Sequence, residues 1–235
     1  EDGTLDISGY DITVSGGGNL DVSGQGHLRL QGGESVTTPI LNTGSQVTYY
    51  GSGDYTLKPW SYHHLDVAGP GRFSTGTSPT LKVGGDLNVS AGTFEFNDTT
   101  ADVTGYLDIG SSAQVDPTNL AGSNVSVGGS LTLTGESGDL LNLRAGGYWN
   151  LTVSGTALAT YVNVSNSDAN AGTTIDATDG TSIDGGSNPN WDFGDQPPQI
   201  YELHPANDTV IELGHVQEFN LTIVNATYPI DYVGL

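Results

Sequence analysis

The residues Leu81 to Ser90 read LKVGGDLNVS, in which two apolar-polar-apolar triplets flank a pair of glycines. Forty-four residues further on, Val125 to Thr134 read VSVGGSLTLT and repeat the pattern. In an extended chain successive side chains point to opposite sides, so each triplet places two apolar side chains on one face. The Gly-Gly pair predicts a sharp corner. The stretch therefore predicts a unit made of a short strand, a corner and a second short strand.

Triplets of this kind recur from Glu1 to about Phe193, each followed within a few positions by Gly, Ser, Asn or Pro. Strands of three or four residues are shorter than the roughly five to six residues usual in a sandwich. They suit a β-solenoid, in which short strands of successive coils stack into parallel sheets. We therefore expect an all-β chain that forms a parallel β-helix, right-handed by the general preference of crossover connections.

The spacing of the repeats predicts the size of a coil. Two coils of about 22 residues would produce the 44-residue repeat. A second repeat, YHHLDVAG at Tyr62–Gly69 and YWNLTVSG at Tyr148–Gly155, has an offset of 86 residues, which is close to four such coils. Eight or nine coils would stack to about 40 Å at the usual strand spacing.

Each part of the opening stretch then has an expected position. Its four apolar residues become inward rungs, and Gly84-Gly85 forms a corner that uses positive φ angles. Asn88 and Ser90 point outward. The four expected rungs are Leu81, Val83, Leu87 and Val89.

The last part of the chain changes character. We expect the β-helix over residues 1–193, with a terminal cap near 158–193 that Trp191 and Phe193 plug, and a proline-containing linker over 194–198. Longer strands over 199–235 predict the opening of an immunoglobulin-like β-sandwich, of which about 100 residues are usual. We expect that the sequence was cut there, or that a strand of a neighbouring copy completes the sandwich.

The composition excludes several classes of partner and of site. Twenty-seven acidic residues stand against five basic ones, for a formal charge of −22, so nucleic acid and anionic lipid are poor partners. The chain has no cysteine, which excludes disulfides and thiolate metal sites. It has no methionine either, so we expect it to begin after a removed leader or inside a longer precursor. No apolar run is long enough to span a membrane, and no membrane insertion is expected of this segment.

Eight Asn-x-Ser/Thr motifs make N-glycosylation a second expectation. In the motifs at Asn88, Asn150 and Asn163, the period of two puts both the Asn and the Ser or Thr on the outward face. A polar sheet rich in these residues can also produce such motifs by accident. The candidate sites are Asn88, Asn97, Asn124, Asn150, Asn163, Asn207, Asn220 and Asn225.

Catalysis is the main rival to a structural role, because parallel β-helices also host polysaccharide lyases and glycosidases. A lyase site needs acidic residues beside Arg or Lys, but the basic residues here are scattered singly along the sequence, at Arg29, Lys58, Arg72, Lys82 and Arg144. Outward aspartates such as Asp66, Asp86 and Asp108 are more simply explained as solubilising positions. We expect no catalytic residues and no resident cofactor.

Two patterns suggest a metal ion. The His63-His64 pair with Asp66 would offer imidazoles, but consecutive strand residues point to opposite faces, so packing is the better explanation. Calcium stays open, because aspartates crowd the segment from Asp168 to Asp192. The candidate ligands there are Asp176, Asp179 and Asp184, and the alternative is that each aspartate caps its own turn.

One segment is dense in aromatic residues and keeps a sugar-binding role open. An exposed aromatic row along the coils would favour an adhesin that binds glycans, whereas a buried row would simply cover one sheet face. The row consists of Tyr49, Tyr50, Tyr55, Trp60 and Tyr62.

The run VGGDLNVSAGTF (Val83 to Phe94), the two repeats at Tyr62 and Tyr148, and the closing segment from Tyr161 to Phe193 resemble the β-helical stalks of large secreted microbial surface proteins. PPQIYELHPANDTVIELG (Pro197 to Gly214) resembles the immunoglobulin-like modules that follow such stalks in archaeal and bacterial cell-surface chains. The resemblance implies an extracellular structural role and carries no catalytic motif with it.

These observations lead to one expectation. The chain is a secreted, non-enzymatic structural protein of a cell-surface layer or extracellular filament, N-glycosylated, with other copies of itself and glycans as its partners. An adhesin and a polysaccharide-active β-helix enzyme are the alternatives.

Overall fold

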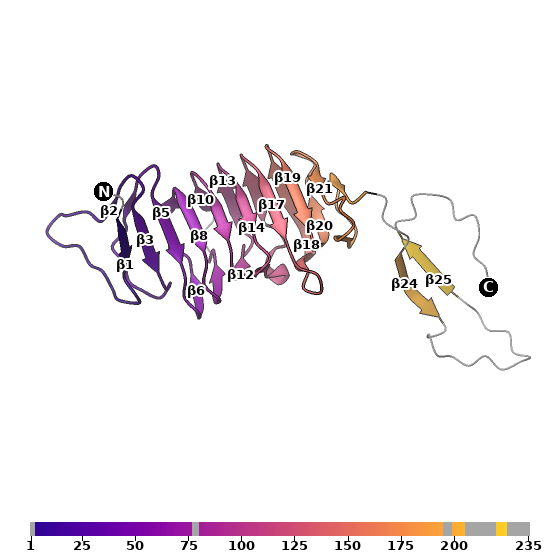
Figure 1. The fold of residues 1–235 in the computed structure, drawn as a ribbon, viewed down its shortest axis with the longest axis horizontal. Helices are drawn as coiled ribbons and strands as arrows, with labels where there is room; N and C mark the ends of the chain where they lie inside the picture. Colours follow the sequence, from indigo (N-terminus) through magenta and orange to yellow (C-terminus); the bar gives the residue numbers. More distant parts are fainter. Residues whose placement is uncertain (1–2, 77–79, 195–198, 205–219, 225–235) are drawn as a thin grey trace, which may run out of the picture.

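The computed structural model describes residues 3–76, 80–194, 199–204 and 220–224. Residues 3–76 and 80–194 form a parallel β-solenoid of about eight turns, seen side-on in Figure 1. In the described part of the chain the one helix is η1, a single 3-10 turn over Pro117–Asn119. The predicted all-β solenoid is confirmed.

Each turn of the coil visits up to three sheets in a fixed order. The first sheet has ten parallel strands and runs the length of the solenoid. Its strands, in spatial order, are β1 (Thr4–Asp6), β3 (His27–Leu30), β5 (Gln46–Tyr49), β8 (His64–Val67), β11 (Leu87–Val89), β14 (Leu107–Ile109), β17 (Leu131–Thr134), β19 (Ala157–Thr160), β21 (Ile175–Asp176) and β23 (Trp191–Asp192).

Two further sheets complete the coil. The second sheet comprises β6 (Asp54–Thr56), β9 (Arg72–Ser74), β12 (Gly92–Glu95) and β15 (Ala113–Val115). The third sheet comprises β7 (Ser61–Tyr62), β10 (Thr80–Val83), β13 (Thr100–Val103), β16 (Asn124–Val127), β18 (Leu141–Val153), β20 (Val162–Asp168) and β22 (Ile183–Asp184). Near the N-terminal end a parallel pair stands apart, made of β2 (Asp21–Val22) and β4 (Ile40–Leu41).

Inward apolar residues in register form the core. On the first sheet one column of six residues is at most 2% exposed, and burying each side chain stabilises the fold by about 1.5–3 kcal/mol. The four rungs predicted in the opening stretch are all buried. The column consists of Leu28, Val47, Leu65, Leu87, Leu107 and Leu131.

The 44-residue repeat is confirmed as two coils. Leu87 pairs with Leu107, and Leu107 pairs with Leu131, so equivalent positions recur after two turns on the same sheet. The prediction from the 86-residue repeat is wrong. Leu65 lies in β8 of the first sheet, whereas Leu151 lies in β18 of the third. Both sheets use the same apolar-polar-apolar pattern before a corner, so local sequence does not tell them apart.

The Gly84-Gly85 corner leads from β10 to β11, as predicted, but positive φ is not the reason for its glycines, because neither residue has one. The corners stack instead. The Gly105 N–H donates to the Gly85 carbonyl oxygen at 2.8 Å, and Gly129 donates to Gly105 at the same distance. A Cβ on Gly129 would lie 2.7 Å from the Gly105 oxygen. Glycine is required at the second corner position, occupied by Gly85, Gly105 and Gly129, because the backbones of successive coils approach too closely there for a side chain.

Two strands of the solenoid are longer than the three or four residues predicted, namely β18 with 13 residues and β20 with 7 residues. β18 pairs through Leu141–Arg144 with β20 and through Asn150–Val153 with β16. Between these parts its register with β20 shifts, and the bulge presents Tyr148, which is 65% exposed. One strand therefore covers two parts of the coil without an intervening corner.

Trp191 and Phe193, predicted as plugs, are both buried in the last described coil. Their rings stack with centroids 5.9 Å apart, and the Trp191 indole N–H donates to Ser167 Oγ at 3.0 Å. Further on, β24 (Gln199–His204) and β25 (Asn220–Val224) form an antiparallel pair. The other residues of the longer strands expected over 199–235 lie outside the described residues.

The interior of the solenoid is packed. A cavity of about 20 Å³ between the sheets is lined by apolar side chains, among them Phe96, Leu120 and Trp149. A volume of this size is comparable to a single water molecule, and an apolar lining keeps it dry. This cavity is therefore too small to hold a ligand. Within the described ranges, no helix has the length and apolarity needed to cross a membrane.

The stacked corners predict the effect of two alanine substitutions. A Cβ on Gly155 would lie 2.5 Å from the Gly129 oxygen, so we expect Gly155→Ala to destabilise the protein by about 1–3 kcal/mol. Gly146 has nothing within 4 Å of its Cβ position and no positive φ, so Gly146→Ala should be close to neutral. Denaturant unfolding of both variants checks this, and equal midpoints would contradict the close-approach explanation.

Candidate functional site

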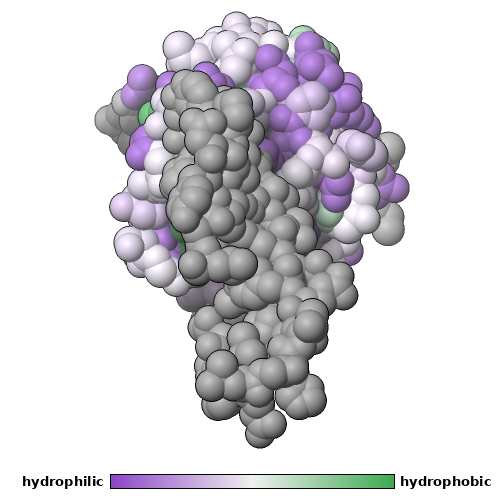
Figure 2. All heavy atoms as spheres, turned by 90° about the vertical axis from the view of Figure 1, so that its right-hand side faces the viewer, coloured by the Kyte–Doolittle hydropathy of each residue, from purple (hydrophilic) through white to green (hydrophobic). Residues whose placement is uncertain are grey.

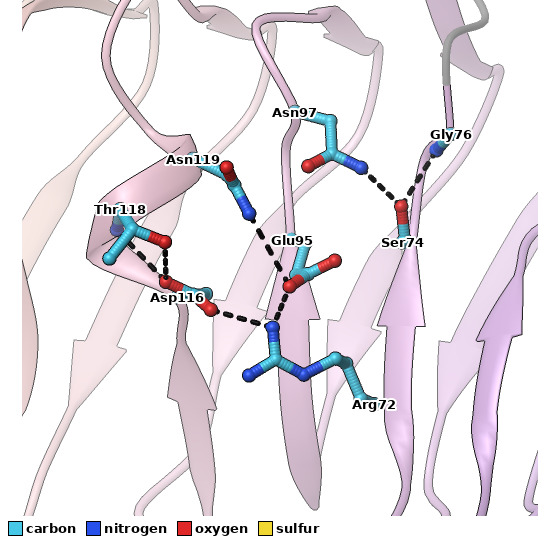
Figure 3. A network of polar contacts seen from close by, with 8 residues as sticks. All are labelled: Arg72, Ser74, Gly76, Glu95, Asn97, Asp116, Thr118 and Asn119. Atoms are coloured by element: carbon cyan, nitrogen blue, oxygen red, sulfur yellow. Dashed lines mark hydrogen bonds and ion pairs between the residues drawn. The ribbon is translucent and has the colours of Figure 1, made fainter.

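A basic and two acidic side chains meet at one edge of the coil, and they come from three successive turns. Arg72 begins β9, Glu95 ends β12 of the next turn, and Asp116 follows β15 of the turn after that. The parallel register of the second sheet brings them together, since β12 lies between β9 and β15. Figure 3 shows both carboxylates turned toward the one guanidinium group.

The Arg72 guanidinium contacts both acids through the same nitrogen. Its Nη1 donates to Glu95 Oε1 and, at 2.6 Å, to Asp116 Oδ2. The side chain of Arg72 is 43% exposed, whereas those of Glu95 and Asp116 are 9% and 13% exposed. Asn119 Nδ2 adds a longer hydrogen bond of 3.5 Å to Glu95. The site is therefore a pair of largely buried carboxylates covered by a half-exposed cation.

Asp116 has a second task in the same place. It is the N-cap of η1, where its Oδ1 accepts hydrogen bonds from the Thr118 backbone N–H at 2.9 Å and from Thr118 Oγ1 at 2.6 Å. Burial alone would raise the pKa of Asp116, but the hydrogen bonds from Thr118 and the charge of Arg72 outweigh it and lower that pKa below 3.8. The carboxylate is held in its charged form.

This arrangement suits structural support better than acid-base chemistry. A general acid or base needs an oxygen or nitrogen that can exchange a proton with substrate, but these carboxylates already accept hydrogen bonds from Arg72, Thr118 and Asn119. The expectation that Arg72 is isolated is wrong, because sequence distance hides partners in neighbouring coils. Glu95 was missed, and its one signal is a charge at an alternating position between Phe94 and Phe96.

A second buried carboxylate belongs to Glu34, which is 2% exposed. Its oxygens accept three backbone N–H groups, from Gln31 at 2.6 Å, Gly32 at 2.7 Å and Gly9 at 3.1 Å. These donors lie in irregular segments of the first two coils, where no strand partner satisfies them. The side chain thus replaces missing backbone acceptors, a role that sequence patterns did not predict.

The histidine pair does not follow the alternation expected of it. His63 lies between β7 and β8, at a corner, and its ring centroid is 4.4 Å from that of His64. The prediction that the two imidazoles point to opposite faces is therefore wrong, because alternation applies only within a strand. His64 Nδ1 lies 3.0 Å from Asp86 Oδ2, while Asp66 accepts from Gln46 on the neighbouring strand. In the part of the chain that the structure describes, no three His, Asp or Glu side chains group to hold a metal.

Each calcium candidate is engaged in its own turn. Asp176 Oδ1 accepts from the Thr178 N–H at 3.1 Å, and Asp179 Oδ1 accepts from the Thr181 N–H at 3.0 Å. Asp184 Oδ1 accepts from the Gly186 N–H at 2.8 Å. These are the turn-capping contacts that aspartate makes without a metal.

Four of the glycosylation candidates lie on the first and third sheets of the solenoid. Asn88 lies on β11 of the first sheet, and Asn124, Asn150 and Asn163 lie on β16, β18 and β20 of the third. Asn97 occupies a turn after β12 with a φ of 49°. Asn220 begins β25, and Asn207 and Asn225 lie outside the described residues.

The outward orientation predicted for the motif at Asn163 is wrong in one respect. Ser165, its hydroxyl-bearing residue, is buried at 7% exposure. β20 pairs with β18 on one side and with β22 on the other. Its buried and outward side chains stop alternating at Ser165, which follows the buried Val164. The position of the motif in the sequence alone therefore overstates its accessibility.

The aromatic row is mainly part of the core. Tyr49, Trp60 and Tyr62 are buried, and the Tyr49 and Tyr62 hydroxyls lie 2.9 Å apart. Burial raises the pKa of Tyr49 to about 12, so both hydroxyls stay protonated. Tyr50 and Tyr55 are half-buried. The row covers a sheet face from inside, which is the alternative to sugar binding that its spacing left open.

The ion cluster of Arg72, Glu95 and Asp116 predicts that replacing Arg72 destabilises the protein more than replacing Arg29. We expect Arg72→Met to destabilise the protein by about 2 kcal/mol, because it leaves two largely buried carboxylates without their cation. Arg29 pairs with Asp6 at 3.0 Å, but both side chains are about one-third exposed, so Arg29→Met should cost under about 1 kcal/mol. Chemical unfolding of both variants at pH 7 measures the difference. A larger loss for Arg29→Met would contradict the structural role of the cluster.

The same cluster predicts a pH dependence. Because the pKa of Asp116 in the folded state is lowered from 3.8, its contribution to stability is present above about pH 4 and is lost as the pH falls through the folded value. The stability difference between the wild type and Arg72→Met should therefore shrink below about pH 3.5. Unfolding curves from pH 7 to pH 2.5 check this. A difference that stays constant to pH 2.5 would contradict the ion cluster.

Comparison of the chain with known proteins finds no family model, no curated protein and no solved structure that matches it.

Proposed function

We propose that the chain is a non-enzymatic structural protein that acts outside the cell, as a subunit of a surface layer or filament. The observation that supports this most is the uninterrupted ten-stranded first sheet, whose inward columns are buried along almost its whole length. Ten strands at a spacing near 4.8 Å give a rod about 43 Å long. A stiff spacer is the function that such an architecture serves directly.

Polar contacts between neighbouring coils add to the stiffness of the rod. Asp6 pairs with Arg29, Gln46 donates to Asp66, and Asn150 Nδ2 donates to Asn124 Oδ1 at 2.6 Å. Each contact joins one coil to the next on the outer surface. Bending the rod would therefore strain both the backbone ladder and these side-chain contacts.

The described residues visible at the C-terminal end of the rod are suited to contact with water. In Figure 2, which views the rod from its C-terminal end, the visible described residues are mostly hydrophilic or neutral, with few hydrophobic ones. The large exposed apolar side chains come from separate parts of the chain, as Tyr10, Tyr106 and Tyr148 illustrate. Scattered single apolar residues are normal on a hydrated surface.

The finer parts of the proposal go beyond the solenoid. They are secretion by a microbial cell, a right-handed coil, glycan attachment to outward asparagines, and an immunoglobulin-like module that includes β24 and β25. In this proposal a strand from a neighbouring copy adds to the β24–β25 pair and builds the polymer. The antiparallel pairing of these two strands supports it, because a small sheet has edges that can accept a further strand.

Electron microscopy combined with sedimentation tests the proposal. We expect the full chain to form oligomers with increasing concentration, and the particles to be rods that join end to end. Thr222→Pro removes a backbone donor from β25 and should abolish assembly, whereas Gly146→Ala should assemble like the wild type. A strictly monomeric wild type at high concentration would refute assembly through this chain, and turnover of a polysaccharide would refute the non-enzymatic role.

A further inference from the structure

The five Asn-x-Ser/Thr motifs of the solenoid differ in how their side chains are held, and this difference sorts them. A transferase that attaches a glycan to the folded rod must reach both Nδ2 of the asparagine and the hydroxyl two residues later, so both groups must be accessible. The inference rests on the proposed function, which includes glycan attachment.

Asn88 meets both conditions. It points outward from the middle of β11, half-exposed, and its amide makes no hydrogen bond in the described structure. Ser90, the hydroxyl-bearing residue of its motif, is exposed, and its Oγ makes one long hydrogen bond of 3.5 Å to the Val67 carbonyl oxygen. Its register partners on both sides, Asp66 and Asp108, are short polar side chains. A glycan here would displace no contact that holds two coils together.

Asn97 meets neither condition. Its Nδ2 donates to Ser74 Oγ on the preceding coil, and Figure 3 shows the amide turned toward that residue. Thr99 is 1% exposed and its Oγ1 lies 3.0 Å from Thr75 Oγ1, inside the coil. Attachment of a sugar would break the Asn97 contact and require Thr99 to leave its buried position.

Asn163 is excluded by the burial of its motif. It lies on β20 between Asn142 of β18 and Ile183 of β22. Its Oδ1 is buried without a hydrogen-bond partner in the described structure. Ser165 is also buried, and its hydroxyl donates to the Ala145 carbonyl oxygen at 3.5 Å.

Asn124 and Asn150 compete with each other. Both are exposed, and they are direct register partners on β16 and β18. The spacing of adjacent strands is about 4.8 Å, and a pyranose ring with its substituents is wider than that, so two glycans would collide at the surface.

The hydrogen bonds of this pair favour Asn124 as the occupied member. Asn150 Nδ2 is the donor of the 2.6 Å bond to Asn124 Oδ1, and Asn124 Nδ2 makes only a 3.4 Å contact with the Gly122 oxygen. A glycan on Asn124 leaves its Oδ1 free to accept from Asn150. Ser126 of the Asn124 motif is exposed, whereas Thr152 of the Asn150 motif is half-buried.

The geometry points to Asn88 and Asn124 as the motifs of the solenoid that carry a glycan on the folded rod, with Asn97, Asn150 and Asn163 left unmodified. One occupied position lies on the first sheet and the other on the third sheet, two faces of the coil.

Cysteine labelling of the full chain tests the geometry without any glycan, because the protein has no cysteine of its own. We expect Asn88→Cys and Asn124→Cys to react with a polyethylene-glycol maleimide in the native protein at close to the rate seen in denaturant. Asn97→Cys and Asn163→Cys should react about a hundredfold more slowly, because the end of each side chain is held against a neighbouring coil and must move away before it can react. Asn142→Cys is the matched control, since Asn142 is exposed and is the register partner of Asn163.

A native Asn163→Cys protein that reacts as fast as Asn142→Cys, with an unchanged unfolding midpoint, would overturn the sorting. If Asn163→Cys fails to fold, the labelling rates of native Asn97→Cys and Asn124→Cys are compared instead. Equal rates for these two variants would overturn the sorting.

Secretion of the full chain from a host that attaches N-glycans tests the assignment itself. Peptide mass spectrometry should find glycans at Asn88 and Asn124, and Asn124→Gln should move the second glycan to Asn150. Molecules that carry glycans at both Asn124 and Asn150 would overturn the competition. A chain without glycans at any motif would overturn the assignment together with the glycoprotein part of the proposed function, and the labelling series would then show whether the geometry was also at fault.

Discussion

The structure depends on one constraint, which is that each coil hydrogen-bonds to the next at a fixed strand spacing. Residues at equivalent positions in successive coils must therefore lie directly over one another. Apolar residues stack on apolar residues inside the coil, and polar residues stack on polar residues outside it. The corners obey the same rule, so the carbonyl oxygen of Gly105 lies where a side chain on Gly129 would begin. Only the segments between strands are free to vary, and 24 residues separate Leu107 from Leu131 where 20 separate Leu87 from Leu107.

The part of this architecture that repeats could be predicted from the sequence. Apolar-polar-apolar triplets and the Gly84-Gly85 corner indicate stacked short strands, because the core repeats a local pattern that every coil must reproduce. The sheet to which a triplet belongs could not be predicted, since strands of the first and third sheets are locally alike. The segments at Leu65 and Leu151 illustrate this, because they share a sequence pattern and lie on different sheets.

The candidate site was beyond sequence reasoning for a related reason. Arg72 and Asp116 are 44 residues apart, and Glu95 lies between them, so nothing local links the three. Their contact depends on the register of three coils, which is known only once every loop length is assigned to a turn. The same holds for the asparagine motifs, since Asn88 and Asn163 look alike in sequence and differ only in what the adjacent coils place around them.

The distribution of charge bears on how such rods associate. The chain has 27 acidic residues against five basic ones, and the acidic residues within residues 3–194 are spread along the length of the coil. Side-by-side packing of two rods would oppose like charges along that length, and at 0.1 M salt screening acts only over about 10 Å. End-to-end contact opposes only the charges of the terminal coils. Electrostatic repulsion thus favours a linear assembly over a bundle. Outward glycans would also hinder side-by-side packing of two rods.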